Sequence, residues 1–486
     1  MKSPSLLAVG VALWVLQGCA AGPNYHRPKD TVPAQWTTAT AHGTLPGIEP
    51  QTDLWWKSFQ DAELDSLIER AVVANYDLKL ATARVFEARA AKGVAQSSFS
   101  PQVTGNASGT RFRQFTVAAV PSSTTKGAVT PTPFAFETNN FQGSFDAVWE
   151  LDVFGRIRSV EAARGDLAAS EHDRRNVLIT LLGDIGRNYA DLRGFQLRLT
   201  IAEENIGVAE ETVKLTRALV QGGQASERDV AQAEAQLESV RAQLPTLNSN
   251  IAVTMHRLAV LLGEQPGALD TELKPRNPVP VAPPQVPVGL PSDLLKRRPD
   301  IQRAEAQLAA ATARIGQAKA DYFPRFTLLG AAGRQATQLH DLTLGLGNFF
   351  SVGPGVTLPV FTGGRIRSNV AVQQARAKEA FDSFQSTVLT SLEEMEDALV
   401  TYANEQDRRD RLEATVHANQ TALELAQVQY RAGLTDFLTV LDSERDLYAN
   451  QDLLAQSQVA IATDLVSLYK ALGGGWSISP EAAKLQ

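Results

Sequence analysis

The chain contains the same module twice, and this duplication limits its fold more than any other feature. The segment 75–104 aligns without a gap on the segment 298–327, and the aligned pairs, such as Asp77 with Asp300, are all 223 residues apart. Because self-similarity at a fixed spacing marks repeated supersecondary units, the sequence predicts one structural unit that is built twice.

Later segments of the two copies also match. LDVFGRIRS at 151–159 matches LPVFTGGRIRS at 358–368 with a two-residue insertion, and two pairs of glycines lie 210 residues apart: Gly223 with Gly433, and Gly263 with Gly473. We therefore predict a first repeat at 61–274 and a second repeat at 292–473. The connector between them, 275–291, is rich in proline, which disfavours helix and central strand.

Each copy predicts the same order of elements: a helix stopped by proline, two strands, a long helix without proline, a glycine turn and a returning helix. In the first repeat these elements are 77–98, strands 102–114 and 140–152, and helices 157–221 and 226–262. In the second they are 300–321, strands 325–335 and 349–360, and helices 366–432 and 436–472. Pro245 lies inside the first returning helix and is expected to kink it.

The best-defined strand alternates between apolar and polar residues. Along 141–151 the side chains of Phe141, Phe145, Trp149 and Leu151 share one face, and polar residues such as Asp146 occupy the other. The returning helix of the first repeat has apolar residues at alternating steps of three and four, from Val230 to Ile251, as in a coiled-coil seam.

These strands and helices together predict an α+β membrane protein. A sheet with open edges cannot stand in lipid, so four strands per chain must be completed by other copies into a barrel. Two chains give 8 strands and a filled bore, whereas three give 12 strands and the beginning of a channel. A long helix of about 65 residues extends to roughly 98 Å, which suits a helical barrel in the periplasm. The alternative is a soluble helical bundle with a small β domain.

The only cysteine of the 486 residues, Cys19, follows a secretory signal pattern. Lys2 precedes an apolar run at 6–16, and Leu16-Gln17-Gly18-Cys19 resembles a bacterial lipobox. We expect residues 1–18 to be a signal peptide, Cys19 to carry a covalent lipid such as palmitate, and 19–60 to be an extended segment. Ala20 favours forwarding to the outer membrane. The alternative is an ordinary buried cysteine. Residues 474–486 are expected to be a C-terminal tail.

The composition argues against several other functions. The net charge of −7 and the lack of a basic face argue against nucleic-acid binding. The six histidines are scattered without metal-ligand spacing, and the chain has no phosphate-binding loop, G-x-S-x-G or H-E-x-x-H motif. We therefore expect no enzyme activity, no metal and no cofactor other than the lipid.

Four segments carry a resemblance to a known family: GCAAGPNYHRP after the signal, the segment 294–330, VFTGGRIRSNV at 360–370 and the segment 429–454. The chain resembles the TolC-like outer-membrane factors, in the NodT-type lipoprotein branch that serves resistance–nodulation–division (RND) efflux systems. The resemblance implies a homotrimer with a 12-stranded barrel in the outer membrane and a helical tunnel in the periplasm. It also implies a passive exit channel for an inner-membrane RND transporter, reached through a periplasmic adaptor (membrane fusion protein).

The resemblance further implies a gate near the glycine turns at Gly222, Gly223 and Gly433. In the family, apolar and acidic rings narrow the tunnel entrance, and Leu438 and Asp442 match those positions. They are four residues apart and thus on one helix face. Three-fold symmetry would give a leucine constriction and a carboxylate ring that selects cations, and the three carboxylates would repel one another. On periodicity alone they are an ordinary seam leucine and a solvated aspartate.

The family also holds its closed state by contacts between neighbouring tips. Asp229 and Tyr430 match two positions of that network, and we call their pairing the tip contact. A basic partner found in some members is replaced by Thr435, so the contact is expected to be weaker or built differently. Glu227 and Arg228 are alternative members, or simply solvated helix charges.

Three other functions stay open on the residues alone. A copper or silver exit channel fits the same fold, although the mature chain keeps only Met255 and Met395 as thioether ligands for Cu(I). An exit channel for type I protein secretion would also share this fold. A structural protein that tethers the outer membrane to the cell wall would conduct no ions. The sequence does not indicate which cargo is carried.

Overall fold

The computed structural model describes residues 21–29, 32–38, 43–46, 48, 53–121, 129–151, 154–283, 285–343 and 347–476. The predicted signal peptide and Cys19 lie outside these residues. Contacts between Cα atoms divide the chain into two compact units: Met1–His26, Ala88–Leu167 and Gln307–Ala380 form unit 1, and Arg27–Glu87, Ala168–Ala306 and Phe381–Gln486 form unit 2. Within the described residues, no helix has both the length and the hydropathy that a membrane crossing requires.

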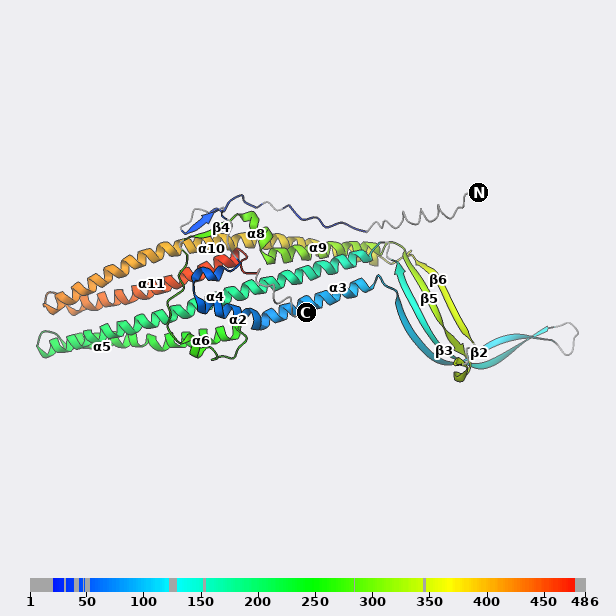
Figure 1. The fold of residues 1–486 in the computed structure, drawn as a ribbon, viewed down its shortest axis with the longest axis horizontal. Helices are drawn as coiled ribbons and strands as arrows, with labels where there is room; N and C mark the ends of the chain where they lie inside the picture. The colour runs from blue at the N-terminus through cyan, green and yellow to red at the C-terminus, as the bar shows by residue number, and fades with distance from the viewer. Residues whose placement is uncertain are drawn as a thin grey trace. The chain divides into compact units, whose positions relative to one another are not determined.

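Unit 1 contains an antiparallel four-stranded sheet in the order β2–β3–β5–β6 (Figure 1). The strands are β2 Gln102–Pro121, β3 Val129–Leu151, β5 Arg325–Ala336 and β6 Asn348–Thr357. The 3₁₀ turn η2, Leu339–Leu342, lies between β5 and β6. We call the end of the sheet where β2 leads to β3 and β5 leads to β6 the distal end, and the end joined to the long helices the proximal end.

The strands of the first repeat are longer than predicted. The pattern at 102–114 and 140–152 underestimates a hairpin that pairs without a break from Gln102–Val148 to Pro121–Val129. Pairing of β3 with β5 ends at Phe141 and Ala336, so the outer part of β2 and β3 forms a two-stranded ribbon (Figure 1). Alternating hydrophobicity could not reveal this ribbon, because neither of its faces covers a core.

The helices that precede and follow the sheet repeat in length. α3 (Tyr76–Ser97) and α9 (Pro299–Ala320) have 22 residues each, and their starts are 223 residues apart. The long helices are α4, Arg156–Gln221, with 66 residues, and α10, Arg365–Arg431, with 67 residues. All four elements are thus within one residue of their predicted starts.

The returning helices differ between the two copies. In the second copy α11 runs unbroken over Phe437–Ala471, whereas the first copy divides into α5, Glu227–Arg241, and α6, Gln243–Leu261. The break at Ala242 has its cause in Pro245, whose ring has no N–H and clashes with the carbonyl four residues earlier. The predicted single helix at 226–262 is therefore wrong, although the kink is in the expected place.

Unit 2 has a core in which short elements pack on the helices. These elements are β1 Thr44–Pro46, η1 Trp55–Phe59, α2 Ala62–Ala74, α7 Asp270–Leu273, β4 Val286–Gly289 and α8 Pro291–Arg297. The ring of Trp55 stacks on Tyr469 of α11 at 5.4 Å between centroids. β1 pairs with β4 in parallel, and α8 starts at Pro291. The predicted connector 275–291 therefore contains a strand and the first residue of a helix. Proline is tolerated at these places because β4 has one neighbour and Pro291 is the first helical residue.

Candidate functional site

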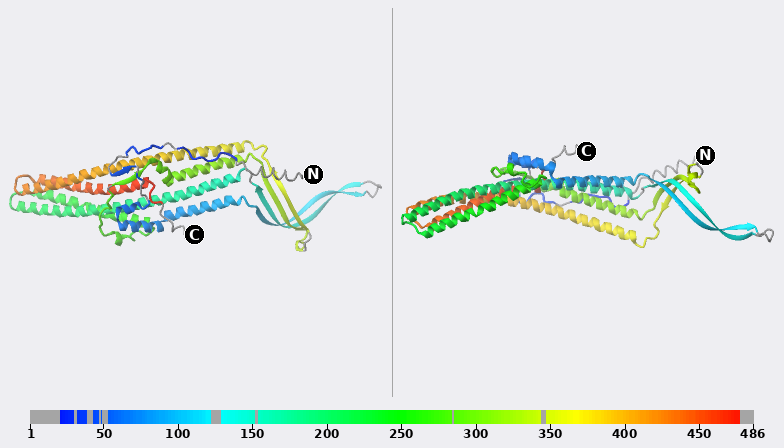
Figure 2. Two further views of the ribbon diagram at one scale, coloured as in Figure 1. Left: turned by 45° about the horizontal axis from the view of Figure 1, so that its top comes forward. Right: turned by 90° about the horizontal axis from the view of Figure 1, so that it is seen from below.

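The two long helices end in turns that lie side by side in unit 2 (Figures 1 and 2). At the first turn the backbone of Gly223 has φ +72°, its N–H donates to Val220 O, and the next N–H donates to Leu219 O. At the second turn Gly433 has φ +70° and makes the equivalent bonds. This is the Schellman arrangement, which needs a residue in the left-handed region and so favours glycine.

The same motif explains the 210-residue spacing of the other glycine pair. Gly263 after α6 and Gly473 after α11 have φ +73° and +72° and again close their helices with two backbone bonds. Gly222 differs, because its φ is not positive. Of the three predicted turn glycines, only Gly223 and Gly433 therefore have the backbone conformation that requires glycine.

The predicted gate residues lie in the first turns of α11. This helix is capped by Asp436, whose carboxylate accepts a bond from the Thr439 N–H. The Thr439 hydroxyl donates to the same carboxylate at 2.9 Å, and this bond, together with the backbone bond and the nearby charge of Arg228, lowers the pKa of Asp436. The side chain of Leu438 is 49% exposed, and that of Asp442 is 62% exposed. Asp442 forms a long ion pair with Arg445, with 4.0 Å between Arg445 Nη1 and Asp442 Oδ1. Both predicted gate side chains are thus available for contacts outside the protomer.

Asp229, a predicted member of the tip contact, has a local role in the protomer. It forms a capping box with Ser226 at the start of α5, where its Oδ2 accepts from the Ser226 N–H at 3.1 Å. The Arg228 side chain, which is 81% exposed, lies 3.8 Å from the Asp229 carboxylate. Asp229 therefore stabilises the first turn of α5 whether or not a neighbouring tip is present.

Tyr430, the other predicted member, is buried near the end of α10. Its ring lies 5.5 Å from that of Phe437, and its hydroxyl has no hydrogen-bond partner among the described residues. Burial, with the charge of Asp229, raises the pKa of Tyr430. The predicted pair is therefore close enough to interact electrostatically, but no hydrogen bond joins the two side chains in the protomer. Thr435 instead bonds to Thr439 at 3.0 Å.

The predicted site residues do not include Glu444, a buried carboxylate two residues beyond Asp442. Glu444 of α11 is 1% exposed, and among the described residues the Thr212 hydroxyl of α4 donates a hydrogen bond to its carboxylate. Burial raises the pKa of Glu444 to about 7. The sequence holds a signal for this position, because Glu444 lies four residues from both Val440 and Tyr448, on the apolar stripe of the helix.

A second site lies where β3 passes into α4 in unit 1. The N–H of Ala21 donates to Phe154 O at 3.1 Å, and the guanidinium of Arg158 donates to Ala21 O at 3.1 Å and to Asn24 Oδ1 at 2.7 Å. Gly22 lies against the backbone of Gly316, where an added Cβ would be 2.4 Å from the Gly316 Cα atom. Ala21, Gly22 and Asn24 are therefore fixed to the junction between strand and helix.

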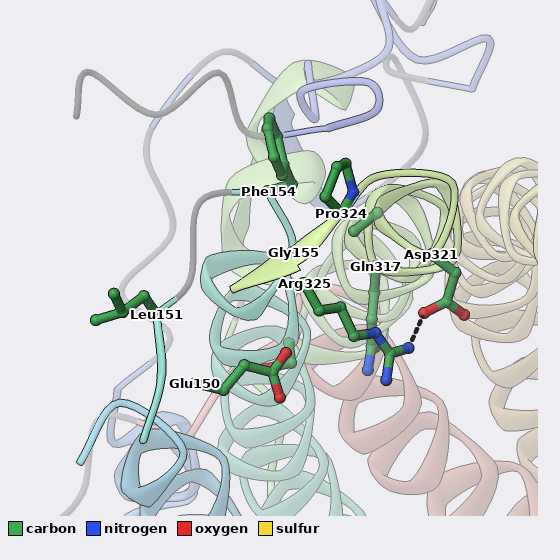
Figure 3. Close-up of a pocket in the computed structure, with 10 residues that line it drawn as sticks. Glu150, Leu151, Phe154, Gly155, Gln317, Asp321, Pro324 and Arg325 are labelled. Carbon is green, nitrogen blue, oxygen red and sulfur yellow. Dashed lines mark hydrogen bonds and ion pairs between the residues drawn. The ribbon is translucent and has the colours of Figure 1, made fainter. Parts of the chain in front are cut away.

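A cavity of about 200 Å³ opens beside this junction (Figure 3). It is lined by ten residues, including Leu151, Phe154, Gln317 and Pro324. Two charged residues of its wall, Arg325 and Asp321, bond to each other at 2.5 Å. Since these charges are already paired, they give no indication of a reactive centre. The described residues also include no cluster of three or more side chains that could hold a metal.

Comparisons with known proteins agree with this arrangement. A family model described as outer membrane efflux protein matches residues 67–264 and 290–474. The solvent efflux pump outer membrane protein SrpC of Pseudomonas putida is 32% identical over 479 residues, covering 96% of this chain and 98% of that protein. Nodulation protein T of Rhizobium leguminosarum bv. trifolii is 30% identical over 465 residues, covering 95% of this chain and 96% of that protein.

The solved structure of the outer-membrane channel OprN has a TM-score of 0.86 with this chain at 34% identity, and the match covers 94% of this chain and 100% of that one. The family model matches the chain in two segments, one in each predicted repeat. The predicted family, the outer-membrane location and the absence of enzyme activity are thereby confirmed. The chain belongs to the outer membrane efflux protein family.

Proposed function

We propose that three copies of this chain form the exit channel of a tripartite efflux pump, through which solvents, antibiotics or similar small compounds leave the cell passively. The cargo would come from an inner-membrane RND transporter through a periplasmic adaptor. One observation carries this proposal: the sheet of unit 1 has an apolar face, a polar face and two edge strands, β2 and β6, with one neighbour each among the described strands.

The edges call for further copies of the chain. In hydrocarbon each unpaired backbone N–H or C=O costs several kcal/mol, so the edges of β2 and β6 need partners. Pairing β6 of one copy with β2 of the next satisfies both edges with the same chain. Three copies supply 12 strands, a number that begins to leave a channel, whereas two copies give a filled bore.

The apolar face matches the thickness of a membrane. From Phe141 to Leu151 the side chains of this face of β3 cover ten steps, about 33 Å along the strand. At a strand tilt near 40° this corresponds to an apolar band of about 25 Å, the height that outer-membrane barrels present to lipid. Large side chains on this face are well exposed in the protomer, among them Phe145 at 70% and Phe350 at 86%.

The opposite face suits a water-filled lumen. Most of its residues are polar or small, with Val148, Leu329 and Phe349 as exceptions. Some of the polar ones bond to one another: Ser144 donates to Asp146 at 3.2 Å, and Asn106 also donates to that carboxylate. Side chains of this kind line a wide pore without selecting a particular cargo.

In this proposal the tunnel entrance is narrowed at the first turns of α11. The exposed side chains of Leu438 and Asp442 would form an apolar ring and a carboxylate ring around a three-fold axis. Opening then requires the tips to move apart when the adaptor docks. The lipid on Cys19 would anchor each copy in the inner leaflet of the outer membrane.

The proposal is tested by deleting the gene in strains with and without the cognate pump. We expect susceptibility to solvents or antibiotics to rise only where the pump is present, and the purified protein to be a trimer that conducts ions in planar bilayers. If the deletion strain becomes sensitive to copper alone, the cargo is copper and not a solvent or antibiotic. If the strain instead fails to secrete a protein, the cargo is that protein. A monomer without conductance would refute the channel itself.

A further inference from the structure

Charge is distributed unevenly on the apolar face of the sheet. The strand register assigns residues that pair across neighbouring strands to the same face. Four charged residues lie on the apolar face within the described strands: Arg111, Arg113, Glu137 and Arg334. All four lie at or beyond the pair Gly143–Arg334, toward the distal end, and the positions of this face nearer the proximal end carry no charge.

The arginines of this group, which we call the arginine belt, are placed for contacts outside the protein. The side chain of Arg111 is 72% exposed and donates one bond to Glu137 at 2.7 Å. Arg113 lies over the ring of Phe115 at 5.5 Å. Arg334 donates to Asn348 Oδ1 at 3.0 Å and to Leu342 O at 3.1 Å.

The belt has donors left over after these bonds. A guanidinium has five N–H donors, and the recorded bonds use one from Arg111 and two from Arg334. Three arginines against one glutamate leave a net charge of +2 on this part of the face in each chain. A belt with these properties favours an anionic ligand with several acceptor oxygens.

We propose that the arginine belt binds the phosphate groups of lipopolysaccharide in the outer leaflet. The inference rests on the proposed function, because that function makes the apolar face lipid-facing and the distal end extracellular. The belt then begins at the distal rim of the apolar band, where Arg334 pairs with Gly143, and continues beyond Phe141 with Arg111 and Arg113. The phosphorylated headgroups of the outer leaflet are found at this level. The ring of Phe115 and the arginine stems can cover the adjoining acyl and sugar surface.

Continuity with the apolar band favours a lipid over a protein ligand. An acidic protein would need a surface of its own, whereas a lipid that already covers Phe145 and Phe350 brings its phosphates to the level of Arg334 and Asn348. Guanidinium groups bind phosphate with two parallel bonds, and the binding is strongest beside an apolar surface that excludes water.

The test measures lipopolysaccharide that stays bound to the purified full-length trimer. We expect the triple variant Arg111→Ala, Arg113→Ala, Arg334→Ala to retain about fivefold less lipopolysaccharide than the parent, because each arginine contributes charge-assisted bonds. Glu137→Gln should retain more than the parent, since it removes the only anion of the group. Arg325→Ala is the matched control, because Arg325 lies in the same sheet at the proximal end and pairs with Asp321.

A second measurement separates phosphate recognition from general lipid binding. The delipidated trimer is reconstituted with lipid A that carries both phosphates or with enzymatically dephosphorylated lipid A. The parent should prefer the phosphorylated form, and the triple variant should not distinguish the two. Equal retention by parent and triple variant, or equal binding of both lipids by the parent, would overturn the proposal.

Trimer formation and conductance are measured on the same samples. If the parent is a conducting trimer but shows no phosphate preference, the belt is refuted and the proposed function stands. If the parent is neither trimeric nor conducting, the proposed function itself has failed.

Discussion

The Nε atom of Arg158 donates a hydrogen bond of 3.1 Å to the carbonyl oxygen of Ala21, two residues after the predicted lipidation site. Arg158 is 4% exposed and also pairs with Glu161 at 2.8 Å. Arg158 therefore holds Ala21, the first described residue after the predicted lipidation site, at the junction of β3 and α4. The geometry thus makes Arg158 a positioning residue for the proposed anchor.

Arg158→Ala should release the segment after Cys19. The change leaves the buried Ala21 carbonyl and the Asn24 amide without a donor, so we expect a loss of about 2 kcal/mol in unfolding free energy. Hydrogen exchange at the Ala21 amide should quicken as well. Arg164→Ala, an exposed arginine of the same helix, serves as the control and should change neither quantity. Unchanged exchange in Arg158→Ala would contradict the assignment.

Leu438→Ala and Asp442→Ala test the proposed gate. Removing the leucine should widen the constriction and raise the conductance of the reconstituted trimer, because a hydrophobic ring resists wetting. Removing the carboxylate should lower the preference for cations over anions. Leu425→Ala, an exposed leucine of α10, is expected to behave as the parent. If neither gate variant differs from the parent, the constriction lies elsewhere.

Tyr430→Phe tests the tip contact. The Tyr430 hydroxyl has no partner in the protomer, so its removal should change the unfolding free energy by less than about 1 kcal/mol. If the hydroxyl bonds to a carboxylate of a neighbouring tip, the conductance of the trimer should rise. Tyr448→Phe is the control, because the Tyr448 hydroxyl donates to Asn205 O at 3.2 Å in the parent. Its removal should lower the unfolding free energy by about 1 kcal/mol. Parental conductance in Tyr430→Phe would exclude its part in closure.

Glu444 should make the stability of the tips depend on pH. Its folded pKa is raised from the ordinary 4.5 to about 7, so the folded state holds the proton more tightly than the unfolded state. The contribution of Glu444 to stability is then greatest below pH 4.5, falls as the pH rises toward 7 and is constant above it, a total loss of about 3 kcal/mol.

Unfolding measured between pH 4 and 8 checks this dependence. Glu444→Gln keeps the shape of the side chain without the charge, so the fall in stability should become smaller by about 3 kcal/mol. The exposed Glu413 of α10 offers the control Glu413→Gln, which should keep the parental slope. A parental slope in Glu444→Gln would show that the carboxyl is not buried as the geometry indicates.

Gly433→Ala should destabilise the turn between α10 and α11. Gly433 has φ +70°, a conformation that costs a residue with a Cβ about 1–2 kcal/mol. Gly222→Ala is the matched control, because that glycine has no positive φ and alanine favours helix. The comparison uses unfolding free energies; equal losses in both variants would mean that the Schellman turn is not what stabilises the tip.

Much of the fold could be derived from the sequence because it is local or periodic. The repeat at 223 residues predicted two helices of equal length, and the alternation of Phe141, Phe145 and Trp149 predicted the apolar face. The lengths of β2 and β3 could not be derived, because the outer ribbon is held by pairing between strands rather than by burial. Pro245 predicts a distortion of the helix near Ala242, but whether the helix bends or divides there depends on the residues that pack around the helix.

The sequence by itself determined the order of elements, the faces of the strands and the glycines that end the helices, since each depends on neighbours within a few residues. Only the tertiary structure decided which polar groups meet. Arg158 and Ala21 are 137 residues apart, and Thr212 and Glu444 are 232 residues apart. Likewise, the isolated hydroxyl of Tyr430 follows from the packing of two helices around it. Such contacts depend on how distant segments pack, and no local pattern encodes that packing.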